Sequence, residues 1–281
     1  MPFFRASDGT ELAYHVQGDG PPLVCLPGGP MRDSVYLGDL GGLSASRRLV
    51  TLDLRGTGRS AVPADAASYR CDRLIGDVAV LQDQLGLDRM DLLGHSAGAN
   101  IAVMYAARHP GRVSRLALVG PSTRAVGLQP SSELRREILD LRQGEPWFPE
   151  AAAAFERLQA GSEGDEGWAA MAPLFYGRWD AVAQAHDAAG EEQVNEEAAS
   201  VFAGPGAFDP EATRAALAAF APPVLVLAGE VDINTPPRIA AELAGLFPDA
   251  RLVVQPGAGH YPWLDDPAWF VSAVADFFAG A

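Results

Sequence analysis

Short apolar runs that end in turn residues recur along the chain and predict strands. Such runs, when both faces of a strand are buried in a parallel sheet, read as nearly continuous hydrophobic stretches rather than alternating ones. They are PPLVCLPGG (21–29), RRLVTLDLRG (47–56), LDRMDLLG (87–94), VSRLALVGP (113–121), PPVLVLAGEVD (222–232) and RLVVQPGAGH (251–260). TELAYHVQ (10–17) alternates loosely instead, which is typical of an antiparallel edge strand.

Helical spacing fills the intervals between these runs. Leu74, Val78, Leu81 and Leu85 recur at helical spacing, and the apolar positions of NIAVMYAARHP, PPRIAAELAGLF and the segment around Phe270 to Phe277 do the same. A repeated order of strand, helix and strand predicts an α/β fold with a mostly parallel central sheet flanked by helices.

The strand signal is lost between residues 122 and 209. This segment contains helical patterns such as SSELRREILDLRQ, and it carries 16 acidic and 6 basic residues. We therefore predict a helical cap inserted at 122–209 into a core domain formed by residues 1–121 and 210–281.

Composition narrows the classes of partner. The net charge of −15 argues against nucleic acid and anionic membrane surfaces, because both attract clustered cations. All 21 basic residues are arginines, which excludes lysine nucleophiles and Schiff bases. The two cysteines, Cys25 and Cys71, have no metal-like spacing, and we expect both to be buried. The segment MPFFRASDGTELAY has no signal-peptide pattern, so we expect a cytoplasmic protein that binds a small molecule, with neither nucleic acid nor membrane as partner.

The sequence GHSAG (94–98) stands between a predicted strand and a predicted helix. It matches G-x-S-x-G, in which a serine sits at a sharp strand-to-helix turn. Only glycine-sized residues two positions before and after the serine avoid collision with such a turn. Ser96 is therefore the candidate nucleophile.

A serine hydroxyl needs a base, and His260 is the candidate. In this strand, turn and helix context the expected chain order is serine, acid, histidine. Of the five histidines, only His260 lies in a loop well downstream of a parallel strand. His15 lies on the antiparallel strand, His109 precedes a proline, His186 lies in the insertion, and His95 is turned away by the sharp turn beside Ser96.

The acid that orients the histidine is expected just after a strand end. AGEVDINTPP offers Glu230 and Asp232. Asp232 is favoured because it lies farther past the strand, where the loop can bring it beside the histidine, and Glu230 is the alternative.

Two backbone N–H groups are expected to form an oxyanion hole. One belongs to the residue after the nucleophile, Ala97. The other comes from the glycine-rich loop PGGPM (27–31), where Gly29 is the first choice and Gly28 the second.

Together these residues resemble a known family. PGGPM, DLRGTGRS (53–60), GHSAG, GEVD and GAGH follow one another as in the α/β-hydrolase superfamily, and the resemblance covers essentially the whole chain. Within the superfamily the sequence is similar to proline iminopeptidases and their esterase-like relatives.

Two departures distinguish this chain from the iminopeptidases. Pro27 and Met31 replace a histidine and a glycine of their oxyanion loop, and His95 and Ala97 flank Ser96 where those enzymes commonly have glycine and tryptophan. In that family, cap glutamates bind the free amino group of the substrate. Here the segment GEEQVNEE offers four glutamates, none of which can be aligned to that role: Glu191, Glu192, Glu196 and Glu197.

The resemblance implies a serine hydrolase with a Ser-Asp-His triad that cleaves an ester, lactone, thioester or amide of a small, largely apolar molecule, without a metal or organic cofactor. Candidate pocket residues are His95, Trp147, Phe148, Trp168, Phe175, Tyr176 and Trp179. Three alternatives stay open: a proline iminopeptidase-type aminopeptidase, a cyclase, acyl-transfer or non-hydrolytic acid/base enzyme on the same fold, and a receptor-like protein that binds a small molecule.

Overall fold

The central feature of the computed structural model, which describes residues 1–161 and 165–280, is a single mostly parallel sheet. Within the described residues the sheet has eight strands in the order β1-β2-β4-β3-β5-β6-β7-β8. Their bounds are β1 Phe3–Arg5, β2 Glu11–Gln17, β3 Pro22–Leu26, β4 Arg48–Leu52, β5 Met90–His95, β6 Val113–Val119, β7 Val224–Gly229 and β8 Ala250–Gln255. The predicted fold class is confirmed.

Strand directions change at one side of the sheet. β2 pairs antiparallel with both β1 and β4, and all other pairs, from β4 to β8, are parallel. The antiparallel direction predicted for residues 10–17 is correct, but the edge position is wrong. The three residues of β1 form the edge instead, and a strand this short has too few positions to show periodicity.

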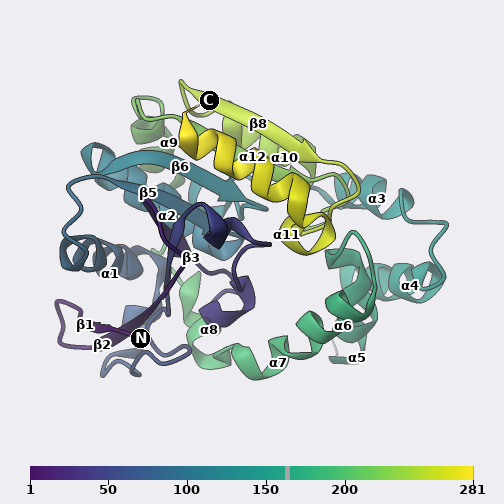
Figure 1. Cartoon of the computed structure of the whole chain (residues 1–281). Helices are drawn as coiled ribbons and strands as arrows, with labels where there is room; N and C mark the ends of the chain where they lie inside the picture. The colour runs from purple at the N-terminus through teal and green to yellow at the C-terminus, as the bar shows by residue number, and fades with distance from the viewer. Residues whose placement is uncertain (162–164, 281) are drawn as a thin grey trace.

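Helices cover both faces of the sheet because successive strand residues point to opposite faces. On one face Val24, Leu92 and Leu118 pack against helices α1 (Cys71–Gln84), α2 (Ala97–Arg108) and α10 (Pro237–Ala244). On the other face Leu23, Leu93 and Val119 pack against α12 (Pro267–Ala279), drawn in yellow in Figure 1. Two-sided burial explains why these strands read as continuous apolar runs.

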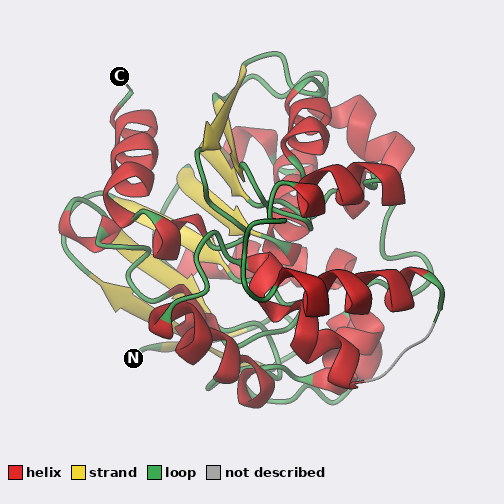
Figure 2. Ribbon diagram, turned by 90° about the vertical axis from the view of Figure 1, so that its right-hand side faces the viewer, coloured by secondary structure: helices red, strands yellow, loops and turns green. Residues whose placement is uncertain are grey.

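The residues described between β6 and β7 form helices and no strand of the sheet. These helices are α3 Ser132–Asp140, α4 Phe148–Gln159, α5 Asp165–Met171, α6 Ala181–Ala188, α7 Gly190–Gln193, α8 Glu196–Phe202 and α9 Pro210–Leu217. Figures 1 and 2 show most of them as a group beside the sheet. The helical content agrees with the expectation from the sequence, and the assignment of 122–209 as a cap domain stays a prediction.

The strand order reverses at β3. The chain passes from β3 to β4 on one side and then crosses to β5 on the other side, so the loops that follow β3 and β5 lie side by side. Such a reversal opens a crevice at the carboxyl ends of the strands, which is where α/β sheets bind ligands. PGGPM and GHSAG, which follow β3 and β5, both lie at this point.

One short helix of the carboxyl-terminal part remains. Helix α11 spans Pro262–Asp265, directly after the loop that follows β8.

In the part of the chain that the structure describes, no helix is both long enough and apolar enough to cross a membrane.

Candidate active site

Ser96 lies at a strained turn between β5 and α2. Its backbone has φ 51° and ψ −121°, a left-handed conformation that few residues other than glycine adopt. Two backbone hydrogen bonds hold the turn: the Ser96 N–H donates to Val119 O, and the Ser122 N–H donates to Ser96 O. The strain is therefore maintained by β6 and the residues that follow it.

Glycines allow three backbone segments to meet beneath this serine. A Cβ atom on Gly98 would lie 2.4 Å from Leu26 O and 2.5 Å from Pro27 O. A Cβ on Gly94 would lie 2.8 Å from Ala99 Cα, and one on Gly28 would lie 2.7 Å from Ser96 Cβ. These approaches are shorter than real Cβ contacts, so the turn requires glycine at each position.

The structure brings Ser96, His260 and Asp232 together. His260 Nε2 lies 2.9 Å from Ser96 Oγ, and His260 Nδ1 lies 2.8 Å from Asp232 Oδ2. With the proton on Nδ1, the histidine donates to the aspartate and accepts from the serine hydroxyl. Asp232 is fully buried, and its other oxygen accepts hydrogen bonds from the Asn234 and Thr235 N–H groups.

The alternative acid points elsewhere. Glu230 is exposed, and its carboxylate accepts a hydrogen bond from the Gly257 N–H, 2.7 Å away. Asp232 is therefore the carboxylate that contacts His260. The catalytic roles of the three residues stay predictions, although the geometry has the form that these roles require.

Two backbone N–H groups lie beside the serine without a hydrogen-bond partner among the described residues. They are those of Ala97, the first residue of α2, and Gly29. The N–H of Gly28, the second choice, donates to the Tyr36 hydroxyl at 2.7 Å and is therefore occupied. Gly29 has φ 117°, where a side chain would be strained.

His95 links the loop after β3 to His260 through Tyr36. Its Nδ1 lies 2.6 Å from the Tyr36 hydroxyl, and its Nε2 lies 2.9 Å from His260 O. Burial lowers the pKa of His95 well below its usual range, and the neighbouring His260 lowers it further. A neutral His95 donates from Nε2 and accepts from Tyr36, so one chain of hydrogen bonds runs from Gly28 to His260.

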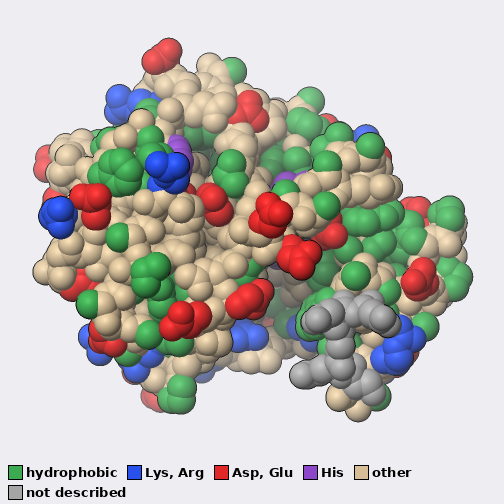
Figure 3. All heavy atoms as spheres, turned by 90° about the horizontal axis from the view of Figure 1, so that it is seen from below, with side chains coloured by type: hydrophobic (Ala, Val, Ile, Leu, Met, Phe, Trp, Pro, Cys, Tyr) green, Lys and Arg blue, Asp and Glu red, His purple; other side chains and the backbone are tan. Residues whose placement is uncertain are grey.

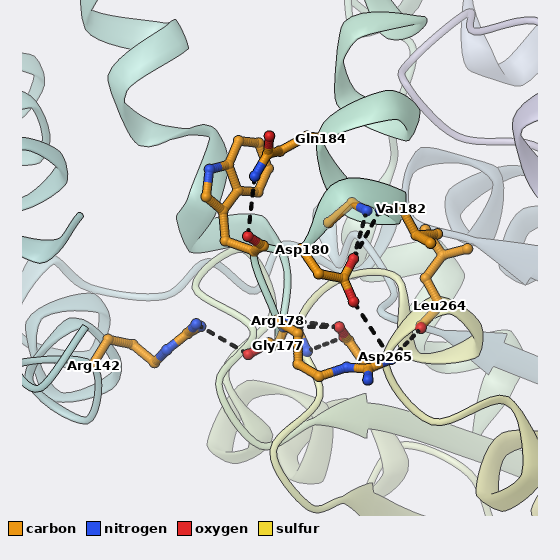
Figure 4. A network of polar contacts seen from close by, with 11 residues as sticks. Arg142, Gly177, Arg178, Asp180, Val182, Gln184, Leu264 and Asp265 are labelled. Atoms are coloured by element: carbon orange, nitrogen blue, oxygen red, sulfur yellow. Dashed lines mark hydrogen bonds and ion pairs between the residues drawn. The ribbon is translucent and has the colours of Figure 1, made fainter. Parts of the chain in front are cut away.

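Asp265 fastens the loop that carries His260 to the helical segment. Its carboxylate accepts hydrogen bonds from the N–H groups of Gly177, Arg178 and Gly259. Figure 4 shows Asp265 beside Gly177 and Arg178, with Arg142 reaching Gly177 O from the other side. Burial raises the pKa of Asp265, while these N–H groups oppose the shift.

A cavity of about 520 Å³ opens over Ser96. Ser96, His260 and Gly29 lie in its wall, together with residues of the helical segment from 122 to 135 and from 196 to 202. Polar side chains form much of this wall, in contrast to the largely apolar pocket expected from the sequence: Asn100, Ser122, Thr123, Arg124, Gln129, Arg135, Glu196, Ser200, Asn234 and Thr235.

The aromatic residues predicted to line the pocket lie elsewhere. Trp147, Phe148 and Phe175 pack against the apolar cluster of α4 and α5. Tyr176 stacks on Tyr261, Trp179 packs on Tyr176, Trp168 is 52% exposed, and His95 is 1% exposed in its hydrogen-bond chain. None of the seven lines the cavity over Ser96. Most of these side chains pack helices against one another or against the sheet, and Trp168 faces the solvent.

Of the four glutamates of GEEQVNEE, only Glu196 lines the cavity among the described residues. The sequence patterns did not predict four residues near the site: Tyr36, Asn100, Arg124 and Arg135. Asn100 and Arg124 follow β5 and β6, so their position near strand ends was a usable signal, whereas no local pattern marked Tyr36 or Arg135. Among the described residues there is no group of three or more His, Cys, Asp or Glu side chains that could hold a metal ion.

Comparisons with known proteins identify the family of the chain. The family model for the alpha/beta hydrolase fold matches residues 21–267. A 2-hydroxymuconate semialdehyde hydrolase from Pseudomonas sp. (strain CF600) is 29% identical, covering 97% of this chain and 92% of that protein. A proline iminopeptidase from Heyndrickxia coagulans is 24% identical over 94% and 92%. The structure of an esterase from Rhodococcus sp. ECU1013 superimposes with a TM-score of 0.72 at 27% identity, covering 99% of this chain and 98% of that one.

Substitution of Gly98 by alanine tests the packing beneath the serine. We expect Gly98→Ala to lower the free energy of unfolding by about 1–3 kcal/mol, because its Cβ would press on the Leu26 and Pro27 carbonyls. Gly76→Ala in α1 is the matched control, since its Cβ meets nothing within 4 Å, and we expect a gain of up to about 1 kcal/mol. Urea unfolding measures both, and equal effects would contradict the steric argument.

Acid stability tests the partly buried His186. Burial and the charge of Arg32 lower the pKa of His186 from 6.5 to about 4. The unfolded state therefore binds more protons between these values, so stability is complete above pH 6.5 and falls as the pH decreases toward 4. We expect His186→Gln to lose less stability than the wild type between pH 7 and about pH 4.5 in urea unfolding. Equal losses would contradict this assignment.

Proposed function

Because the chain belongs to the alpha/beta hydrolase fold family, we propose that it is a serine hydrolase acting through an acyl-enzyme on Ser96. Its substrate is a small molecule with an ester, lactone, thioester or amide bond. The observation that carries this proposal is the continuous hydrogen-bonded series of Ser96, His260 and Asp232 at the wall of a cavity.

In the first half of the reaction, Ser96 Oγ attacks the carbonyl carbon of the substrate. The hydroxyl proton passes to His260 Nε2, and the buried Asp232 carboxylate stabilises the imidazolium that results. The negative oxygen of the tetrahedral intermediate accepts hydrogen bonds from the Gly29 and Ala97 N–H groups. His260 then gives the proton to the leaving group as its bond to carbon breaks, which leaves Ser96 acylated.

In the second half, water attacks the acyl-enzyme. His260 accepts a proton from the water molecule, and the second tetrahedral intermediate forms in the same oxyanion site. Its collapse returns the proton to Ser96 Oγ and releases the acid. In comparable enzymes, each oxyanion-hole donor lowers the activation free energy by about 3–4 kcal/mol.

The helical segment 122–209 acts as a cap in this proposal. It supplies one wall of the cavity, and Arg32 of the core loop binds it through hydrogen bonds to Gln193 Oε1 and His186 O. The core and the segment are further joined by the bridge between Arg32 and Val194. These contacts support a cap that stays fixed to the oxyanion loop.

The cavity favours an ester substrate over a peptide with a free amino terminus. An aminopeptidase needs acidic side chains around the substrate amine, and Glu196 is the acidic residue that the cavity offers. Arg124 and Arg135 share that wall and repel an ammonium group.

The proposed activity is tested with p-nitrophenyl acetate, p-nitrophenyl butyrate and proline p-nitroanilide. We expect turnover of the esters but not of the anilide, and Ser96→Ala to lower ester kcat by about 10⁴-fold or more. Fast anilide cleavage would indicate an aminopeptidase instead. Labelling of Ser96 by a fluorophosphonate without turnover of any ester would indicate a ligand-binding protein.

The assignment of the acid is tested by a pair of neutral substitutions. We expect Asp232→Asn to reduce ester kcat by about 10³- to 10⁴-fold, because the histidine loses the carboxylate that fixes its tautomer. Glu230→Gln, two residues away, is the matched control and should change kcat less than about threefold, since the exposed Glu230 carboxylate binds the Gly257 N–H rather than His260. The reverse ranking would make Glu230 the acid.

Tyr36 is a positioning residue in this mechanism. Tyr36→Phe leaves the Gly28 N–H and His95 Nδ1 without their partner, so the loop bearing Gly29 loses its anchor. We expect kcat to fall about tenfold with a smaller change in KM. The control is Tyr105→Phe, which removes a buried hydroxyl bound to Gln82 away from the site. Equal kcat values in the two variants would contradict a positioning role.

A further inference from the structure

Three donor side chains in the cavity wall have no acceptor. Arg124 and Arg135 both line the cavity over Ser96, and neither guanidinium has an ion pair or a side-chain hydrogen bond within residues 1–161 and 165–280. Two arginines that are more deeply buried have carboxylate partners. Arg47 contacts Asp91, and Arg55 contacts both Asp8 and Asp77.

Asn100 adds an independent observation. It is 1% exposed and lines the same cavity. Its Oδ1 accepts a hydrogen bond from the Ala125 N–H at 2.9 Å, which fixes the orientation of the amide. The Nδ2 group is then a buried donor without a partner. A buried donor normally has an acceptor, so the missing one is expected on a ligand.

The two arginines also act on each other. Burial lowers the pKa of Arg135, and the charge of Arg124 lowers it further. The only carboxylate in the described wall is that of Glu196. Two guanidinium groups and one carboxylate leave this wall one positive charge in excess, within a chain whose net charge is −15.

We propose that the cavity binds a substrate that carries a carboxylate, held by Arg124 and Arg135 with Asn100 Nδ2 as a further donor, while its scissile bond lies at Ser96. A single carboxylate balances the excess charge, and guanidinium groups bind planar carboxylates through paired hydrogen bonds. The inference rests on the proposed function and specifies its substrate class: esters or related acyl compounds with a second, free acid group.

The acidic outer surface differs in charge from the wall that contains Arg124 and Arg135. Acidic side chains are scattered over the face seen in Figure 3, which is hollowed near its middle. A negatively charged surface slows the approach of anions, so recognition of a carboxylate depends on the arginines inside the cavity rather than on long-range attraction.

The kinetic test compares matched esters. One pair is mono-p-nitrophenyl glutarate and p-nitrophenyl pentanoate, in which a carboxylate replaces a terminal methyl group. The other is 4-acetoxybenzoate and its methyl ester, which places the carboxylate on the leaving group. We expect kcat/KM to favour the anionic member of at least one pair by about tenfold or more. Preference for the neutral member of both pairs would overturn the proposal.

Variants identify the side chains responsible. Arg124→Gln and Arg135→Gln should each reduce the ratio of kcat/KM for the anionic ester to kcat/KM for the neutral ester at least about fivefold. Arg136→Gln is the matched control, because Arg136 is next to Arg135 on α3 but pairs with exposed Glu156. A preference that survives in the double variant Arg124→Gln/Arg135→Gln would overturn the proposal.

A binding measurement separates this inference from the proposed reaction. Calorimetry with Ser96→Ala should show monoethyl glutarate binding about tenfold or more tightly than ethyl pentanoate, and the added Arg124→Gln/Arg135→Gln changes should abolish the difference. If this result holds while the wild type hydrolyses no ester, the serine hydrolase proposal fails and the carboxylate site stands. Equal binding of the two esters would overturn the carboxylate site.

Discussion

The site depends on the close approach of three backbone segments beneath Ser96. The loop after β3, the end of β5 and the start of α2 meet at distances that leave no room for a Cβ atom on Gly28, Gly94 or Gly98. This packing holds the serine at φ 51°, a conformation that costs about 1–3 kcal/mol. The same packing places the Ser96 hydroxyl at the point where the strand order reverses, beside the Ala97 and Gly29 N–H groups.

Hydrogen bonds also hold the loops around Ser96 and His260 in place. The chain from Gly28 through Tyr36 and His95 ends on the carbonyl of His260, and Asp265 binds the loop that carries this histidine. The three residues of the proposed triad therefore lie in a frame held by hydrogen bonds. The far wall of the cavity belongs to a helical segment of different composition, so the proposed mechanism places reactivity and selectivity in separate parts of the chain.

The sequence predicted those features that arise from local patterns. Two-sided burial produced the apolar runs, the turn at Ser96 dictated its glycines, and the choice of Asp232 over Glu230 followed from distance past β7. It failed where the outcome depends on packing between distant segments. Aromatic content in the helical segment could not tell which side chains face the cavity, so Trp147 and Tyr176 were assigned wrongly while Arg135 was overlooked. The three residues of β1 were too few for periodicity.

The long sequence separation between Ser96 and His260 has a consequence for synthesis of the chain. These residues are 164 positions apart, and His95 is 165 positions from the histidine whose carbonyl it binds. Ribosomes make proteins from the amino terminus, so Ser96 emerges long before His260, the base proposed to activate it. A serine hydroxyl without such a base is a weak nucleophile. The growing polypeptide therefore carries an inert serine until its last strand and the loop after it have been made and folded.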